Sequence, residues 1–252
     1  MLGLNLFSIR NLIQTEEDYL KTSILLKEKG YDFVQYSGAN FDAEMIKRVI
    51  DKSELKVNLT HVPINRILND TDRLMHEHDL IGCRNIGLGA LMPDVITDEK
   101  PFKETVDKLN VVAKRMENSG FTFCYHHHNF EFYQHNGESA FDYIIKNAPN
   151  IKFTLDTYWL QYGGADIALF AQKLKNRIQC VHLKDYYTNK DMKPGYCKLG
   201  SGVMDLKSIT SIMKNNGAKY LFVEQDNAHE LPDGLEQVLE SLKYFKENVD
   251  NG

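Results

Sequence analysis

The sequence has few cysteines, and they do not form pairs. Its 252 residues include only Cys83, Cys124, Cys180 and Cys197, and no C-x-x-C motif. Cys124 and Cys180 fall inside apolar runs, where a free cysteine behaves as a small core residue. This usage indicates a reducing compartment.

Three further absences narrow the class of protein. Thirty Lys and Arg residues against 35 Asp and Glu residues give a formal charge of -5 with no basic block, so the chain lacks the cationic surface that nucleic-acid binding requires. No apolar run approaches the roughly 18 residues of a membrane span, and residues 1–10 lack the positive start of a secretory signal. We therefore expect a soluble cytoplasmic protein with no nucleic-acid or membrane partner.

No linker rich in proline, glycine or serine divides the chain. With 42% apolar and 11% aromatic residues, the chain can bury a full core. We expect residues 1–252 to form a single domain.

Short apolar runs typical of β-strands alternate with longer amphipathic segments about eight times, which predicts an α/β fold, a single (β/α)8 TIM barrel. An open doubly wound sheet is the alternative, but it usually has a glycine-rich turn after its first strand, and residues 7–10 offer none. The predicted strands cover residues 2–7, 33–36, 57–61, 85–88, 122–126, 152–156, 179–183 and 221–224. The predicted helices cover residues 15–29, 42–51, 70–82, 98–118, 138–147, 165–176, 205–216 and 232–247.

Four successive predicted strands end in segments that carry an acid or an imidazole. These segments are 125–131, 155–157, 181–185 and 223–226. In a parallel barrel the carboxyl ends of the strands meet at one face, so these side chains converge there. Carboxylates and imidazoles in that arrangement predict a site for one divalent metal.

The end of the fifth predicted strand leaves a choice of side chain. The period of two in a strand sends His126 and His128 to one side and His127, expected to be packed or exposed, to the other. Glu131 follows in the loop, where it either reaches back to the barrel mouth or remains a solvated carboxylate.

The other three strand ends are simpler. Asp156 closes an apolar run and needs a cation or a hydrogen-bond network; a helix-capping role is not expected, because the next helix is predicted near Ala165. His182 and Lys184 share one face and point inward. Glu224 ends the eighth predicted strand, where a rim salt bridge is its alternative role.

An oxygen-rich ligand set of this kind suits Mn²⁺, Mg²⁺ or Co²⁺, with Zn²⁺ also open. Such a metal can hold two neighbouring oxygens of a sugar and stabilise the enediolate that forms when a base removes the adjacent proton. A carboxylate can shuttle that proton, and Lys184 can donate to the developing oxyanion.

Four ordered motifs connect the chain to a known family: YHHHNFEF at 125–132, LDTYW at 155–159 with Gly163 and Gly164, VHLKD at 181–185, and LGSGV at 199–203 before Asp205. Over its whole length the chain resembles the xylose-isomerase-like TIM barrels, in particular the sugar phosphate isomerases and epimerases that share their fold with family-2 apurinic endonucleases.

The resemblance implies one divalent metal bound by Glu131, Asp156, His182 and Glu224. Many relatives have a glutamate within the fifth strand, where this chain has His126. His126 or His128 is therefore the alternative first ligand, with Glu131 then left to bind substrate or act as the base. Catalytic roles are expected for Glu131, Glu224, Lys184 and His128, and substrate contacts for His61, His126 and Trp159.

Weaker candidates for substrate contacts lie at other strand ends, at Asn5, Tyr36 and Gly89. The glycine-rich run at 199–203 either offers backbone N–H groups to a substrate oxygen or phosphate or forms a plain turn.

We expect a metal-dependent isomerase or epimerase that acts on a small-molecule sugar, keto-sugar or sugar phosphate. The main alternative is a lyase of the inosose-dehydratase type, which would expel a hydroxyl from the same enediolate. A DNA-repair endonuclease and a non-catalytic sugar-binding barrel are further alternatives. The sequence leaves the oligomeric state open, a homo-oligomer included.

Overall fold

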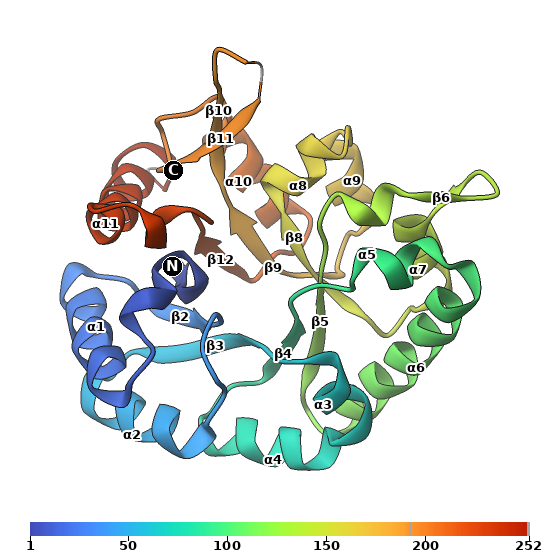
Figure 1. Cartoon of the computed structure of the whole chain (residues 1–252), viewed down its shortest axis with the longest axis horizontal. Coiled ribbons are helices and arrows are strands. Elements are labelled where there is room, and N and C mark those ends of the chain that lie inside the picture. Colours follow the sequence, from blue (N-terminus) through green and yellow to red (C-terminus); the bar gives the residue numbers. More distant parts are fainter. Residues whose placement is uncertain (192, 251–252) are drawn as a thin grey trace.

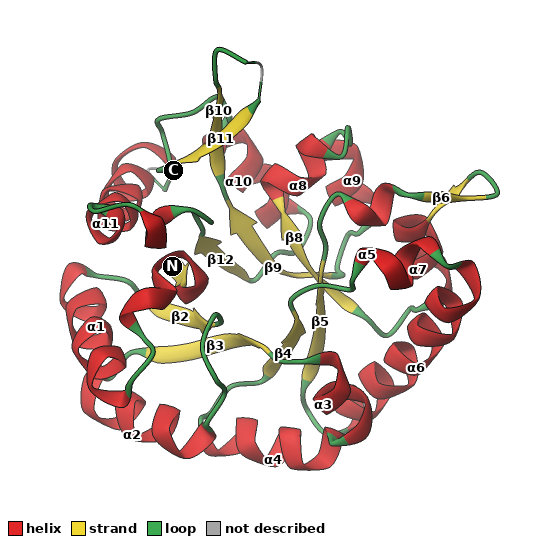
Figure 2. Cartoon of the chain, in the orientation of Figure 1, coloured by secondary structure: helices red, strands yellow, loops and turns green. Residues whose placement is uncertain are grey.

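The computed structural model describes residues 1–191 and 193–250. Eight parallel strands close into a barrel in the order β1-β12-β9-β8-β5-β4-β3-β2, which confirms the predicted TIM barrel. Figure 2 shows these strands as a central ring with helices around it. The barrel strands are β1 (Gly3–Asn5), β2 (Phe33–Tyr36), β3 (Lys56–His61), β4 (Asn85–Leu88), β5 (Thr122–His126), β8 (Lys152–Asp156), β9 (Ile178–Leu183) and β12 (Tyr220–Val223).

The outer layer consists of α-helices and short helical turns that connect the strands. The helices are α1 (Glu16–Lys29), α2 (Ala43–Ser53), α3 (Ile64–Asn69), α4 (Thr71–Leu80), α5 (Pro93–Thr97), α6 (Glu99–Asn118), α7 (Ala140–Asn147), α8 (Thr157–Tyr162), α9 (Ile167–Lys173), α10 (Leu206–Asn215) and α11 (Gly234–Tyr244). The shorter turns are η1 (Leu6–Leu12), η2 (Phe130–Phe132), η3 (Ala228–Glu230) and η4 (Phe245–Val249).

The first long helix begins and ends where the sequence predicts. The Thr15 side chain accepts a hydrogen bond from the Asp18 N–H, three acidic residues occupy the first turn, and Gly30 follows the last turn at φ 98°. Acids near a helix start and a left-handed glycine after its end are both stabilising.

An apolar layer inside the barrel supports the polar layer above it. Side chains two residues apart on a strand point the same way. The apolar members of this layer precede polar residues by two positions on the same strands: Phe33 before Gln35, Cys124 before His126, Cys180 before His182 and Phe222 before Glu224. Gly3 leaves room for this packing, because a Cβ there would lie 2.4 Å from the Phe33 ring.

Several short elements differ from the sequence expectation. Residues 6 and 7, predicted as strand, belong to η1, because the Asn5 side chain accepts from the Phe7 N–H and starts a helical turn. Two hairpins, β6 (Gln134–His135) with β7 (Glu138–Ser139) and β10 (Asp185–Thr188) with β11 (Pro194–Cys197), extend beyond the ring (Figure 1). Helices α3, α5 and α8 were also not predicted.

Among the described residues, no helix combines the length and apolar character needed to cross a bilayer.

Candidate metal centre

Four side chains converge at the carboxyl ends of neighbouring strands: His126 on β5, Asp156 on β8, His182 on β9 and Glu224 just after β12. Their ligand atoms lie within 4.8 Å of one another, and no member is more than 4% exposed. The strand register produces this arrangement, because β8 pairs with β9 with Asp156 directly beside His182.

Each imidazole in the cluster is oriented by a carbonyl-type acceptor. The His126 Nδ1 lies 2.7 Å from the Gly89 carbonyl oxygen, and the His182 Nε2 lies 2.7 Å from the Gln35 Oε1. Since a carbonyl oxygen can only accept, each of these ring nitrogens carries the proton. The other ring nitrogens, His126 Nε2 and His182 Nδ1, face the carboxylates. Burial acts to lower the pKa of His182, but Glu224 and Asp156 raise it to about 9, so His182 Nδ1 also carries a proton until a metal displaces it.

The carboxylate of Glu224 is oriented in the same manner. The Asn5 side-chain amide donates to its Oε1 at 2.7 Å, which leaves Oε2 turned toward His182 Nδ1 at 2.7 Å. These two buried atoms form an ion pair with each other when the His182 ring is protonated.

This donor set fits a divalent cation. Two carboxylates and two imidazoles converge on one point, and a bound cation would displace the His182 Nδ1 proton and compensate the two buried negative charges. Mixed nitrogen and oxygen ligands suit Zn²⁺, Mn²⁺ or Co²⁺. Such partners behind the ligands are what fixes ligand orientation in metal sites.

Lys184 supplies positive charge beside the cluster. Its Nζ lies 3.0 Å from Asp156 Oδ2, 3.3 Å from Glu224 Oε2 and 2.9 Å from Asp226 Oδ1. Burial acts to lower the pKa of Lys184, but the three carboxylates raise it well above its usual value. The ammonium group therefore persists at neutral pH.

The same charges set the protonation of the cluster. Burial alone would raise the pKa of Asp156, yet Lys184 and the two imidazoles hold it well below its usual value. Burial likewise opposes ionisation of Glu224, and His182 and Lys184 lower its pKa. Both carboxylates are ionised, as metal ligands must be.

A cavity of about 280 Å³ opens above the cluster. That size suits a small ligand rather than a polymer. The polar side chains that line it are Ser37, His61, His126, His128, Lys184, Glu224 and Asp226.

Glu131 does not join the cluster. Its fully buried carboxylate accepts from the Tyr125 hydroxyl at 2.8 Å and from the His128 N–H at 2.9 Å, and burial raises its pKa to about 7. The geometry brings His126 into the position that the resemblance gave to Glu131. The open choice at this strand end thus favours the first histidine.

The other two histidines of the triplet have separate surroundings. His128 lines the cavity, with its ring 5.3 Å from Phe130 and 5.1 Å from Trp159, and burial lowers its pKa to about 2. His127 points away from the cavity, where its Nε2 accepts from the Asp156 N–H at 3.1 Å. His128 is therefore neutral, and His127 holds the backbone of a cluster residue.

The remaining predicted substrate residues lie at or near the cavity. His61 lines it, and burial lowers the pKa of His61 well below its usual value. Trp159 packs against His128, and its ring centre is 5.6 Å from Lys184 Nζ. Among the weaker candidates, Asn5 and Gly89 hold cluster residues, whereas the Tyr36 hydroxyl donates to the Asn40 carbonyl.

One expectation was wrong, and one alternative that the sequence left open is narrowed. Asp156 does cap a helix: its Oδ1 accepts from the Trp159 N–H at 3.0 Å, because α8 starts directly after it instead of near Ala165. In the glycine-rich run, the N–H groups of Gly200 and Gly202 are used within the protein, since they donate to the Asp185 carboxylate at 2.9 and 3.0 Å.

Gln35 contacts the cluster, although the sequence did not predict it as a site residue. It links His182 to His61, because its Oε1 accepts from His182 and its Nε2 lies 3.2 Å from the His61 ring. The sequence feature that could have indicated Gln35 is its position as a polar residue in the otherwise apolar or aromatic β2 run Phe33–Tyr36.

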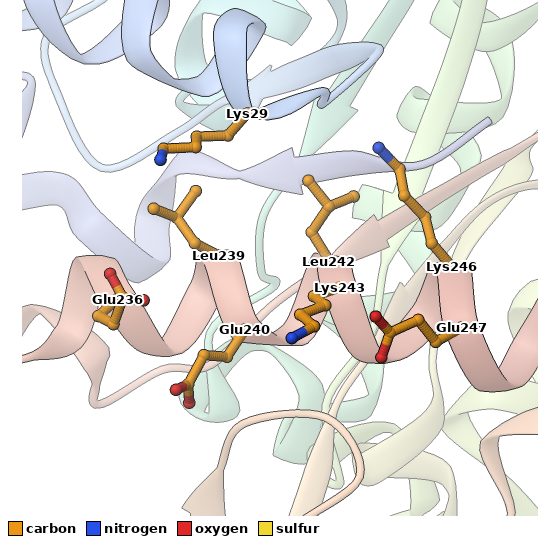
Figure 3. A pocket seen from close by; sticks show the side chains of 8 residues that line it. All are labelled: Lys29, Glu236, Leu239, Glu240, Leu242, Lys243, Lys246 and Glu247. Atoms are coloured by element: carbon orange, nitrogen blue, oxygen red, sulfur yellow. The ribbon is translucent and has the colours of Figure 1, made fainter.

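A second hollow, of about 350 Å³, lies on the outer layer between α1 and the chain's last helix (Figure 3). Its lining mixes lysines and glutamates with Leu239 and Leu242, and the Lys246 ammonium there donates to the Gly30 carbonyl. It is larger than the mouth cavity, but it contains none of the four converging side chains. We therefore place the chemistry at the barrel mouth.

Comparisons with known proteins agree with this architecture. The sequence model of the xylose isomerase-like TIM barrels matches residues 24–248. An inosose dehydratase of Clostridium perfringens is 26% identical over 171 residues, which cover 61% of this chain and 57% of that protein. The match thus spans less than two thirds of that relative's length.

Solved structures share the fold. A sugar phosphate isomerase/epimerase from Parabacteroides distasonis superposes with a TM-score of 0.82 at 19% identity, covering 98% of this chain and 93% of its own. The IolI protein, solved with a bound zinc atom, superposes with a TM-score of 0.73 at 14% identity over 100% of this chain and 99% of its own.

Proposed function

The chain belongs to the xylose isomerase-like TIM barrel family, and from this premise we propose that it is a divalent-metal-dependent enzyme that isomerises or epimerises a small sugar or keto-sugar through an enediolate. The observation that carries the proposal is the buried group of His126, Asp156, His182 and Glu224, whose ligand atoms lie within 4.8 Å of one another. The zinc bound to the IolI protein, which has the same fold, adds support.

In the proposed site, His126, Asp156, His182 and Glu224 hold the metal. When bound there, the cation would polarise the substrate carbonyl and stabilise negative charge on the adjacent oxygens. His126 replaces Glu131 in this ligand set.

The chain's own side chains would move the protons. Glu224 lines the cavity, and its ionised carboxylate can accept the proton from the carbon next to the carbonyl. Lys184, held as an ammonium ion by three carboxylates, donates to the developing oxyanion. Return of the proton to the neighbouring carbon, while Lys184 regains a proton from that carbon's hydroxyl, completes isomerisation. Epimerisation would need a proton from water on the opposite face of the first carbon.

His61, His128 and Trp159 would bind and orient the substrate. His61 and His128 line the cavity as neutral imidazoles, so each can donate and accept hydrogen bonds with hydroxyl groups. Trp159 gives an apolar surface beside Lys184 that suits the carbon face of a sugar. Glu131 is proposed to stabilise the loop that carries His128.

A dehydratase is the second candidate, because the relative from Clostridium perfringens is named inosose dehydratase. The same enediolate would then expel a hydroxyl from the next carbon as water, with Lys184 as the donor of the proton.

Deuterium exchange tests both reactions. The metal-loaded protein is incubated in deuterium oxide with a panel of ketoses and keto-polyols, and incorporation is followed by proton NMR. We expect exchange next to the carbonyl, with isomer, epimer or dehydrated product identifying the reaction. Glu224→Gln should slow exchange by about 100-fold or more, and an exposed control, Glu117→Gln, should not. Absence of exchange with the whole panel would leave only a binding role.

A further inference from the structure

The loop after the seventh barrel strand, β9, is built around an internal anion. The buried carboxylate of Asp185 accepts four backbone N–H groups, from Tyr186 at 2.9 Å, Gly200 at 2.9 Å, Gly202 at 3.0 Å and Met204 at 3.1 Å. Clusters of backbone N–H groups of this kind form anion-binding concavities in proteins.

The backbone shape of this loop depends on that contact. A Cβ at Gly202 would lie 2.1 Å from Asp185 Oδ1, so only glycine permits the close approach. The carboxylate therefore belongs to the folded loop and leaves none of these four N–H groups for a ligand.

The position of this concavity is relevant to whether the substrate carries a phosphate group. In TIM barrels a substrate phosphate frequently binds to backbone N–H groups of the loops after the seventh and eighth strands. Here the Asp185 carboxylate already accepts from four backbone N–H groups of the loop after the seventh strand. The eighth loop adds the carboxylate of Asp226, and its Gln225 N–H donates to the Ser8 hydroxyl at 3.0 Å.

The cationic side chains near the cavity are also already paired. Among the described residues that line it, Lys184 is the one lysine or arginine, and three carboxylates surround it. Arg10 contacts two of the residues that line the cavity, because its Nη1 donates to the Phe7 carbonyl at 2.7 Å and to the Asp226 carbonyl at 3.3 Å. A phosphate dianion entering this mouth would meet Glu224 and Asp226 without a free cationic partner.

We propose that the substrate of this site is uncharged, a ketose or keto-polyol without a phosphate group, and that Asp185 occupies as an internal anion the place that the barrel could offer to a substrate phosphate. The inference rests on the proposed function for the identity of the reacting group. The conclusion that the substrate lacks a phosphate depends only on the charged and N–H groups of the described residues.

The first test follows the amide signals of Gly200, Gly202 and Met204 by NMR while inorganic phosphate is added to the Mg²⁺-loaded protein. We expect no saturable shift, because Asp185 occupies these donors. A saturable shift at these amides in the wild-type protein would overturn the proposal.

A variant pair sharpens this test. Asp185→Ser removes the internal carboxylate, and Asp191→Ser, on the exposed tip of the same hairpin, is the matched control. In a folded Asp185→Ser protein the freed amides should respond to phosphate, and in the control they should not. A folded Asp185→Ser protein with unresponsive amides would show that the concavity is not an anion site, against the proposal.

The second test compares deuterium exchange with matched substrates, each ketose or keto-polyol against its phosphate ester. The ester should exchange about 100-fold more slowly or worse, since like charges a few ångströms apart repel strongly in a partly buried site. Equal or faster exchange of the ester contradicts the inference. If neither compound exchanges, the proposed function fails, while the amide titration still decides the question of phosphate.

Discussion

At the scale of single residues, hydrogen bonds from neighbouring groups orient the side chains of the cluster. Gly89, Gln35 and Asn5 each occupy one polar atom of His126, His182 and Glu224. The opposite atoms of these three side chains, together with Asp156, are thereby aimed at one point. Residues that never touch the metal thus prepare the site for it.

The triple histidine gives the first prediction. His126→Ala should weaken binding of Zn²⁺ or Mn²⁺ by about 100-fold or more, because a ligand is lost. His128→Ala, two residues away on the same side, should leave metal affinity within a few-fold of the wild type. Calorimetric titration of both variants measures this, and an unchanged affinity in His126→Ala would return the ligand role to another side chain.

Glu131 gives a prediction about pH. Burial raises its folded pKa to about 7, above the unfolded value of about 4.3, so the folded state binds the proton more tightly. The resulting stability is present in full below pH 4 and is lost as pH rises through 7, by about 4 kcal/mol.

Glu131→Gln should remove this loss, because an amide does not ionise. Chemical denaturation from pH 5 to pH 8 should show a smaller fall in unfolding free energy for Glu131→Gln than for the wild type. An exposed control, Glu117→Gln, should follow the wild type. Parallel curves for Glu131→Gln and the wild type would contradict the burial argument.

At the scale of elements, α8 ties the metal site to the fold. Asp156 is both a cluster member and the residue that caps α8. Its two oxygens divide these tasks, with Oδ1 toward the helix and Oδ2 toward His126 and Lys184.

Two substitutions separate the tasks of Asp156. Asn is an equally good helix cap, whereas Ala is not, and the difference is about 1 kcal/mol. Asp156→Asn and Asp156→Ala should both lose tight metal binding, but Asp156→Ala should be less stable to denaturant by about that amount when both are measured with a chelator. Equal stabilities would mean that the cap contributes nothing.

The elements also show what a sequence can predict. The barrel strands follow from short apolar runs, and Asp156, His182 and Glu224 are noticeable because each closes such a run. Helix α8 has six residues, too few for a helical period to appear, and it follows a strand without a turn residue. Gln35 remained hidden because its partner His182 lies 147 positions away on a strand that does not pair with β2.

The triple histidine illustrates a different limit. A period of two places His126 and His128 on one side, and the sequence holds no signal that separates them. The structure does, because β5 ends at His126, and because the Glu131 carboxylate that might have filled the site is used by Tyr125 and the His128 backbone. Distances between side chains, which composition does not encode, are therefore what supports the proposal of His126 as the ligand.

At the scale of the whole molecule, metal binding should stabilise the barrel. The cluster joins four strands that span residues 122–224, and a ligand that binds only the folded state adds about 2.7 kcal/mol at a concentration 100 times its dissociation constant. For a chain of this length we expect the melting temperature to rise by about 5–10 °C. Scanning calorimetry with and without metal tests this, and Glu224→Ala should show little rise.

The central claim is that one divalent ion is bound by His126, Asp156, His182 and Glu224, with Glu131 outside its ligand shell. Anomalous diffraction at the absorption edge of zinc, from crystals of the zinc-loaded protein, tests it most directly. The account predicts a single strong peak within about 2.3 Å of one atom from each of the four side chains. No peak at the barrel mouth, several ions there, or direct coordination by Glu131 would contradict it.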